Sequence, residues 1–315
     1  MKILIPGGSG YIGRQLSASL VKDGHEVVIL TRGQRRAFPP PLAGEGQAGG
    51  LRDVTWDART ASGDWVDELA DAQGIINLAG ANVGSGRWTR QRMAQILSSR
   101  LAATSAIVQA IEATPIDRRP SVLLNASGID YYGNRGDDII TEDGEPGDSF
   151  LARMSQKWET AALKAEPLGL RVVRMRTSMV FGRGAPAFNL LTLPIRLFVG
   201  GPLGSGRQWF TWIHVDDIIG LYRFGLENER LSGAVNAVAP DIRRQVEVAR
   251  EIGRALHRPT WFPAPALLLR LALGTQSQLL LDGRRAVADK AKAAGYRFQF
   301  GGLRQALEEI RRRRC

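Results

Sequence analysis

Three glycines near the start of the chain have the spacing of a dinucleotide-binding loop. Gly7, Gly10 and Gly13 form the pattern GxxGxxG, which follows the apolar run 3–5 and precedes apolar residues at helical spacing. The first glycine permits a tight turn, the second lets a pyrophosphate approach the main chain, and the third lets a helix pack on the strand. We therefore expect a dinucleotide, with its phosphates at the helix N-terminus, to contact Gly7, Ser9, Gly10, Tyr11, Ile12, Gly13 and Arg14.

The residues after the second predicted strand indicate which dinucleotide is bound. An NAD-binding protein needs an acidic residue there, about 20 residues after the glycines, to bond the ribose hydroxyls. This chain has Thr31 and Arg32 instead, and Arg14 directly follows Gly13. Guanidinium groups bond a 2′-phosphate well because several N–H donors meet its oxygens. The sequence thus favours NADP(H) as the cofactor. The alternative is that both arginines are solvated surface residues.

Alternating strand and helix patterns place this loop in a parallel sheet. We predict strands at 2–6, 25–30, 53–57, 74–79, 121–126 and 171–176, and helices at 11–22, 64–71, 89–113 and 150–165. The alternation is typical of an α/β, Rossmann-type doubly wound parallel sheet with crossover helices. Residues 33–52 are rich in Gly and Pro and are expected to form a mobile surface loop without regular structure.

The alternation loosens after residue 182. A helix near 187–199, a strand near 209–214, a helix near 216–228 and a strand near 234–238 are followed mainly by helices. We predict an NADP-binding Rossmann domain at 1–182 and, at 183–315, a smaller, mainly helical C-terminal substrate lobe that is interleaved with the sheet.

Composition limits the compartment and the partners. The 315 residues include 42 Lys and Arg against 31 Asp and Glu, a net charge of +11 that is diffuse apart from 35–36 and 311–314. A solvated basic tail is the favoured interpretation, and weak attraction to nucleic acid or anionic surfaces is the alternative. The single cysteine, Cys315, excludes an internal disulfide and fits a reducing cytoplasm. No apolar stretch is long enough to span a bilayer. We expect a cytoplasmic protein with no membrane partner and no specific nucleic-acid partner.

Further motifs give the chain a resemblance to a known superfamily. Asp57 ends the third predicted strand, the sequence Asn-Leu-Ala-Gly stands at 77–80, and Trp-Ile-His-Val-Asp-Asp at 212–217. With the glycine loop, these motifs resemble the extended short-chain dehydrogenase/reductase superfamily. Tyr-Tyr-Gly at 131–133 and Leu-Asp-Gly at 281–283 resemble more narrowly its NAD(P)-dependent epimerase/dehydratase-like branch of unassigned substrate. The resemblance spans essentially the whole chain and adds Asp57, Leu78, Ala79 and Gly80 to the expected cofactor site.

The resemblance implies four groups: a catalytic serine, a tyrosine that acts as general acid and base, a lysine four residues after the tyrosine, and an asparagine on an earlier helix. Ser127 fits the serine because it follows the fifth predicted strand, where carboxyl ends of strands meet the ligand crevice. The tyrosine and lysine positions hold Leu151 and Ser155, and Arg100 replaces the usual asparagine. Three of the four expected groups are therefore absent from their usual positions.

Nearby residues offer replacements for the absent groups. Tyr131 and Tyr132 follow Ser127 on the same loop, and the charge of Arg100 would favour the ionised form of such a tyrosine. Lys157 is a further candidate. The alternatives are a packed tyrosine with a satisfied hydroxyl and, for Arg100, a salt bridge on a helix face. The candidate catalytic residues are Ser127, Tyr131, Tyr132 and Arg100.

Two functions are compatible with these residues. The first is an NADP(H)-dependent oxidoreductase or epimerase-like enzyme that transfers a hydride to or from a small carbonyl or alcohol substrate. The second is a noncatalytic NADP(H)-binding protein that senses redox state or presents a surface to a partner. No metal is expected, because the histidines at 25, 214 and 257 lack metal-ligand spacing. The sequence predicts neither the substrate nor the oligomeric state.

Overall fold

The computed structural model describes residues 1–33 and 50–313, and its centre is a seven-stranded sheet. The strand order is β11-β7-β5-β4-β1-β2-β3, and every neighbouring pair is parallel. The predicted Rossmann-type α/β fold is thereby confirmed. The strands are β1 (Lys2–Pro6), β2 (Glu26–Thr31), β3 (Leu51–Thr55), β4 (Gly74–Asn77), β5 (Val122–Gly128), β7 (Arg171–Thr177) and β11 (Gly233–Ala237).

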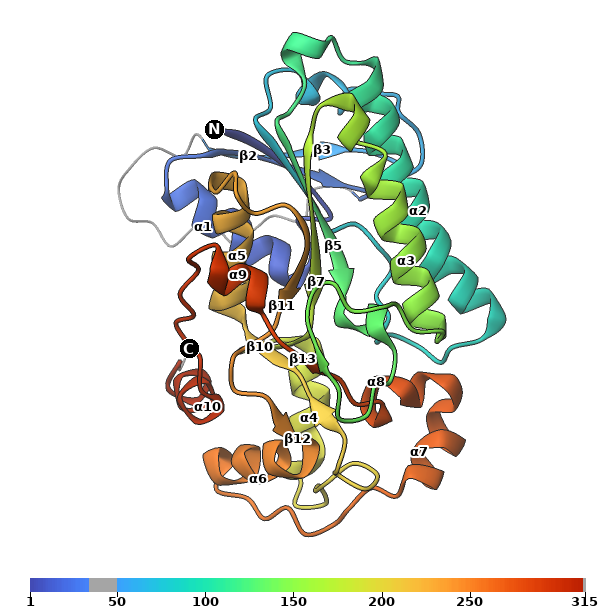
Figure 1. Ribbon diagram of the computed structural model, residues 1–315, viewed down its shortest axis with the longest axis vertical. Helices are drawn as coiled ribbons and strands as arrows, with labels where there is room; N and C mark the ends of the chain where they lie inside the picture. Colours follow the sequence, from blue (N-terminus) through green and yellow to red (C-terminus); the bar gives the residue numbers. More distant parts are fainter. Residues whose placement is uncertain (34–49, 314–315) are drawn as a thin grey trace.

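Helices cover both faces of this sheet (Figure 1). α1 (Tyr11–Lys22) and α5 (Val215–Glu227) lie on one face, and α2 (Arg90–Ala113) and α3 (Phe150–Leu163) lie on the other. Successive side chains of a strand point to opposite faces, so Ile3 and Ile5 join one core while Leu4 joins the other. The strands can be almost wholly apolar because both faces are covered.

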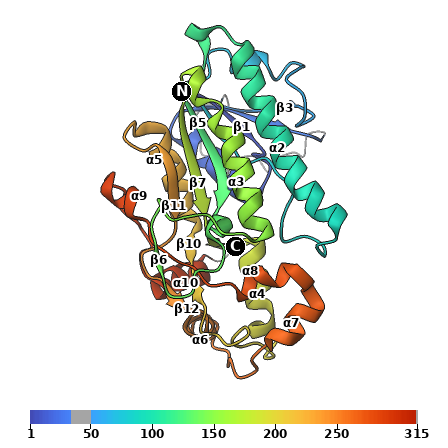
Figure 2. The same ribbon diagram turned by 45° about the vertical axis from the view of Figure 1, so that its right-hand side comes forward.

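The residues after 182 form most of the lower part of the molecule in Figures 1 and 2. α5 and β11 nevertheless return to the main sheet, so this part of the chain contributes to both regions. The division at residue 182 stays a prediction. The other elements are β6 (Ile139–Ile140), β8 (Met179–Phe181), α4 (Pro186–Arg196), β9 (Trp209–Phe210), β10 (Trp212–His214), β12 (Arg243–Arg244), α6 (Gln245–Leu256), α7 (Ala266–Leu273), α8 (Gln278–Leu281), β13 (Arg285–Ala286), α9 (Asp289–Ala293) and α10 (Leu303–Arg312).

The structure shows that two of the secondary-structure predictions are wrong. The helix expected at 64–71 is a single 3-10 turn, Asp67–Leu69, because Trp65 and Leu69 are held in the core and Asp71 has a left-handed backbone. The third strand begins at Leu51, earlier than expected, because 51–55 pair with 27–31 of β2. The predicted mobile loop falls mainly on residues 34–49, outside the described residues. Among the described residues, no helix is long and apolar enough to cross a membrane.

Candidate nucleotide site and active site

The glycine loop lies where β1, β2 and β4 end. Gly7 turns out of β1 with φ +78°, and its N–H donates to the carbonyl of Leu30 at 3.1 Å. A Cβ at Gly7 would lie 2.8 Å from the backbone between Leu78 and Ala79, and a Cβ at Gly13 would lie 2.5 Å from the carbonyl of Gly8. The protein's own packing therefore requires glycine at positions 7 and 13.

Gly10 is different, because the protein leaves space beside it. Its backbone is extended, with φ −74° and ψ 176°, and a Cβ there would approach only the carbonyl of Gly7, at 3.4 Å. Gly10 is the N-cap of α1, and no side chain caps this helix. The N-terminus of α1 thus fits an approaching phosphate, which the helix N–H groups and the helix dipole favour.

The side chain of Asn77 fixes the loop 78–80 against the glycine loop. Its Oδ1 accepts the N–H of Ala79 at 3.1 Å, and its Nδ2 donates to Thr104 at 3.0 Å and to Asn125 at 2.7 Å. The N–H of Leu78 donates to the carbonyl of Pro6 at 2.9 Å. The two loops expected to hold the cofactor, at 7–14 and at 78–80, therefore lie together.

The polar residues expected near the ribose follow β2 and β3. Arg14 is exposed and donates from Nη1 to the carbonyl of Ser9 at 2.7 Å, and Arg32 is exposed just after β2, next to the half-buried Thr31. Asp57 lies after β3 with its carboxylate exposed. The backbone N–H groups of Thr60 and Arg59 donate to this carboxylate and hold the pKa of Asp57 below its usual value.

Arg100 forms no salt bridge with the described residues. Its guanidinium also does not lie over Tyr131 or Tyr132, in the loop after β5. Its side chain is buried, and Nη1 donates to the carbonyls of Ala81 at 2.9 Å and Ile96 at 3.0 Å. Its guanidinium lies 4.9 Å from the ring centroid of Trp158 and borders Gly80. Burial lowers the pKa of Arg100 to about 10, so the group stays charged at neutral pH. Arg100 thus holds the loop at 80–81, beside the candidate nucleotide site.

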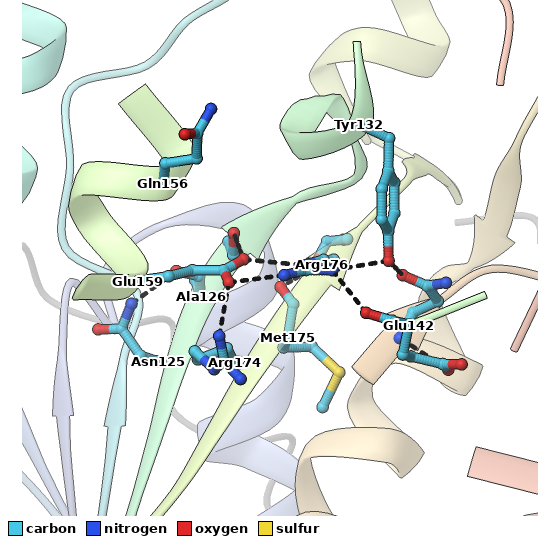
Figure 3. Close-up of polar contacts among 12 residues, drawn as sticks. Asn125, Ala126, Tyr132, Glu142, Gln156, Glu159, Arg174, Met175 and Arg176 are labelled. Atoms are coloured by element: carbon cyan, nitrogen blue, oxygen red, sulfur yellow. Dashed lines mark hydrogen bonds and ion pairs between the residues drawn. The ribbon is translucent and has the colours of Figure 1, made fainter. Parts of the chain in front are cut away.

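Ser127 is part of a buried ionic network that spans β5, α3 and β7. Figure 3 shows Glu159, Arg174 and Arg176 of this network. Its hydroxyl donates to Oε1 of Glu159 at 2.7 Å. The same carboxylate accepts Nε of Arg176 at 2.8 Å and Nη2 at 2.9 Å, and it accepts Nη1 of Arg174 at 3.0 Å. Glu159 is only 2% exposed. The two guanidinium groups and the hydroxyl offset the free-energy cost of burying its negative charge. β5 and β7 bring Ser127 and Arg176 together as directly paired residues.

Arg176 also connects this network to the two candidate tyrosines. Its guanidinium lies 3.5 Å from the ring centroid of Tyr131 and 4.9 Å from that of Tyr132. Its Nη1 donates to the Tyr132 hydroxyl at 2.7 Å, and that hydroxyl donates to Asn236 at 2.8 Å. Tyr132 is fully buried, and burial raises the pKa of Tyr132 to about 12. Tyr132 is therefore the packed tyrosine with a satisfied hydroxyl, whereas Tyr131 is half-buried.

Glu159 and Arg176 belong to the site in the structure but are not among the residues expected there from the sequence. A signal existed, since β7 reads Arg-Val-Val-Arg-Met-Arg-Thr, and an arginine inside a central strand needs a buried partner. The Trp-Glu pair in α3 supplies that partner. Leu151 and Ser155, at the positions of the usual tyrosine and lysine, are both buried in the same helix, and Lys157 is exposed.

A group of potential metal ligands within the described residues lies at the junction of α5 and α10. His214, Asp216 and Glu309 place one ligand atom each within 4.8 Å of one another. Nε2 of His214 is 3.0 Å from Glu309, and Arg313 forms ion pairs with both carboxylates. Because Arg313 already supplies a positive charge there, we assign no metal to this group.

The fold and the glycine loop together define a dinucleotide-binding protein of Rossmann type. The family model "NAD dependent epimerase/dehydratase family" matches residues 3–237, and "Domain of unknown function (DUF1731)" matches 264–310. The chain belongs to the NAD-dependent epimerase/dehydratase family, which confirms the resemblance to extended short-chain dehydrogenases/reductases.

Relatives of this chain have nearly the same length. It is 34% identical to the epimerase family protein YfhF of Bacillus subtilis, covering 98% of both chains. It is 33% identical to the "Epimerase family protein SDR39U1 homolog, chloroplastic" of Arabidopsis thaliana, covering 98% of this chain and 86% of the relative. A crystal structure of human epimerase family protein SDR39U1 (isoform 2) with NADPH is similar, with a TM-score of 0.85, 33% identity and 99% coverage of both chains.

Proposed function

We propose that the protein binds NADP(H) in the glycine loop and acts as an oxidoreductase or epimerase-like enzyme on a small carbonyl or alcohol substrate. The observation that carries this proposal is the open space beside Gly10 at the N-terminus of α1. Among the described residues, no packing contact requires a glycine there, whereas the approach of a pyrophosphate would. NADPH in the similar human structure supports the same choice of nucleotide.

Arg14 and Arg32 are expected to make NADPH bind better than NADH. The 2′-phosphate accepts charge-assisted hydrogen bonds, each worth about 1.5–3 kcal/mol. Arg32→Ala and Arg14→Ala should therefore weaken NADPH binding by about ten- to a hundredfold and leave NADH binding unchanged. Calorimetric titration of each variant with both nucleotides measures this. Arg304→Ala, which removes an exposed arginine of α10, is the control. Equal wild-type affinities for the two nucleotides would rule out the proposed 2′-phosphate site.

The proposed chemistry places Ser127 and Tyr131 at the substrate. Bound NADP(H) supplies or accepts a hydride. The Ser127 hydrogen points to Glu159, so the oxygen of Ser127 is left to accept a hydrogen bond from a substrate hydroxyl. For a substrate carbonyl, the Ser127 hydrogen must turn from Glu159 to the substrate oxygen. Tyr131, half-buried on the same loop, would exchange the proton, while Glu159 and Arg176 position both residues.

Ser127→Ala and Tyr131→Phe are expected to lower turnover without weakening NADPH binding. Loss of one hydrogen bond to a developing oxyanion costs about 2.7–4 kcal/mol of barrier, or roughly a hundred- to a thousandfold in rate. Loss of general acid and base catalysis has an effect of about 10²–10⁴. The assay is nicotinamide absorbance with a panel of carbonyls and quinones. Tyr132→Phe is the matched control, because its hydroxyl is buried among protein groups and should affect stability rather than proton transfer. If both variants keep full activity, these roles are misassigned.

A noncatalytic NADP(H)-binding redox sensor is the second candidate function. It is favoured by the burial of Leu151 and Ser155 at the positions where the superfamily has its proton-transferring pair. A sensor would bind NADPH and gain thermal stability from it, yet no substrate of the panel would oxidise the bound nucleotide. For either function we propose a reducing compartment, the cytoplasm, because Cys315 is the only cysteine.

A further inference from the structure

Most of the large apolar side chains that are exposed lie together at one end of the molecule. Within the described residues, ten of the thirteen such side chains belong to α4 and the residues after it, to the segment between α6 and α7, and to α7. These elements form the lower end of the molecule in Figures 1 and 2. We call this the lobe-tip surface. Its members are Leu190, Leu193, Leu197, Phe198, Val199, Trp261, Phe262, Leu267, Leu268 and Leu271.

Backbone contacts join the separate segments of the lobe-tip surface. The N–H of Gly204 donates to the carbonyl of Ala264 at 2.8 Å, and the N–H of Ala264 donates to the carbonyl of Pro202 at 2.8 Å. The guanidinium of Arg258 lies 4.5 Å from the ring centroid of Phe198. The segment after α4 and the segment before α7 are thus fixed side by side, which brings the exposed apolar residues of both segments to the same end of the molecule.

The folded core does not explain the apolar side chains of α7. This helix reads Ala-Leu-Leu-Leu-Arg-Leu-Ala-Leu, and none of its residues is buried. Leu267 and Leu271 are both 67% exposed, and Trp261 just before the helix is 77% exposed. Monomeric proteins rarely expose so many large apolar groups in one place unless another molecule covers them.

The charge around the lobe-tip surface is mostly positive, although Glu251 of α6 pairs with Arg254 at 2.7 Å. The stretches 167–215 and 252–281 contain no Asp and no Glu, whereas Arg196, Arg254, Arg258 and Arg270 all lie within them. These four arginines are exposed. A shallow depression of about 520 Å³ beside Trp261 is lined by Arg250, Arg254, His257 and Arg258. Positive charge that borders exposed apolar groups is complementary to an anionic surface with an apolar interior.

We propose that the lobe-tip surface binds peripherally to an anionic lipid bilayer. Trp261, Phe262 and the leucines of α7 enter the boundary between headgroups and acyl chains, and the arginines pair with lipid phosphates. A second copy of the chain is a poorer occupant, because two predominantly basic surfaces would repel each other. The proposal revises our expectation that the protein has no membrane partner. That expectation was based only on the lack of a segment long enough to span a bilayer. It is independent of the proposed enzymatic function.

Co-sedimentation with lipid vesicles tests this proposal on the full chain. The protein should bind vesicles of phosphatidylcholine mixed with phosphatidylglycerol, bind vesicles of phosphatidylcholine alone much more weakly, and dissociate as salt is added. The combined variant Leu267→Ser, Leu268→Ser, Leu271→Ser should lose about tenfold or more of this binding. Its melting temperature should be unchanged, because α7 has no buried residue. Arg254→Gln with Arg258→Gln should lose the preference for phosphatidylglycerol.

Ile116→Ser is the matched control, since Ile116 is 79% exposed but lies in the turn after α2, far along the chain from the lobe-tip surface. It should bind vesicles as the wild type does. Three results would overturn the proposal: no binding to either vesicle, an equal loss in the control, or full binding by the α7 variant. A fourth contradicting result would come from light scattering. If the wild type is a dimer and the α7 variant is a monomer, a second copy of the chain covers this surface instead of a membrane.

Discussion

Gly10→Val is expected to abolish NADPH binding and to leave the protein folded. A Cβ at this position would meet only the carbonyl of Gly7, at 3.4 Å, and the backbone conformation suits any residue. The added side chain would instead occupy the space where the pyrophosphate approaches the helix N-terminus. Loss of two charge-assisted hydrogen bonds corresponds to about a hundredfold or more in affinity. Fluorescence titration with NADPH measures the affinity, and circular dichroism confirms the fold.

Gly302→Val is the matched control for this experiment. Gly302 is also the N-cap of a helix, α10, with extended backbone, no capping side chain and nothing within 4 Å of an added Cβ. It should bind NADPH with wild-type affinity. If Gly10→Val also binds NADPH normally, the nucleotide does not lie where we place it. Gly7→Ala and Gly13→Ala are expected to unfold the loop itself, because the added Cβ would overlap backbone atoms.

Glu159→Gln is expected to lower the free energy of unfolding by about 3–5 kcal/mol. The substitution keeps the shape of the side chain but leaves Arg176, whose side chain is 3% exposed, without its buried counter-charge. Equilibrium unfolding in urea at neutral pH measures this loss. Glu308→Gln is the control, since Glu308 pairs with Arg304 on the surface of α10 and should contribute less than about 1 kcal/mol. An equal effect of the two substitutions would mean that the buried network does not stabilise the site.

The network around Glu159 connects the loop after β5 to α3 and β7, and we expect it to make this loop rigid. Arg176 binds Glu159 on α3, stacks on Tyr131 and donates to Tyr132, so one side chain connects the helix to the loop after β5. Ser127 is anchored to the same carboxylate. A rigid arrangement of this kind keeps the candidate groups in place before a substrate arrives, which is what catalysis by positioning requires.

The sequence predicts the parts of this protein in which local pattern determines structure. The strand before Gly7, the glycine loop and α1 follow from apolar periodicity and from backbone requirements that only glycine meets. The parallel sheet follows from the alternation of elements. A helix is expected at 64–71, but core contacts of Trp65 and Leu69 leave only the turn at 67–69.

The sequence does not predict pairings between charged residues far apart in the chain. Glu159 and Arg176 are 17 residues apart. The position of Arg176 inside a central strand indicates that it needs a buried partner, but no local pattern identifies Glu159 as that partner. The sequence suggests Arg100 as the charge near Tyr131 or Tyr132, yet the guanidinium over both rings is that of Arg176. Only the register of β5 against β7 places Arg176 beside Ser127. Long-range register of this kind depends on the whole sheet rather than on any local motif.

Calorimetric titration of the wild-type protein with NADPH, and separately with NADH, tests the central claim most directly. We predict one NADPH site per chain, binding of NADH that is about ten- to a hundredfold weaker, and a melting temperature that rises with NADPH concentration. The absence of heat and of any thermal shift with NADPH would contradict the account, since it would leave the open space beside Gly10 without a ligand.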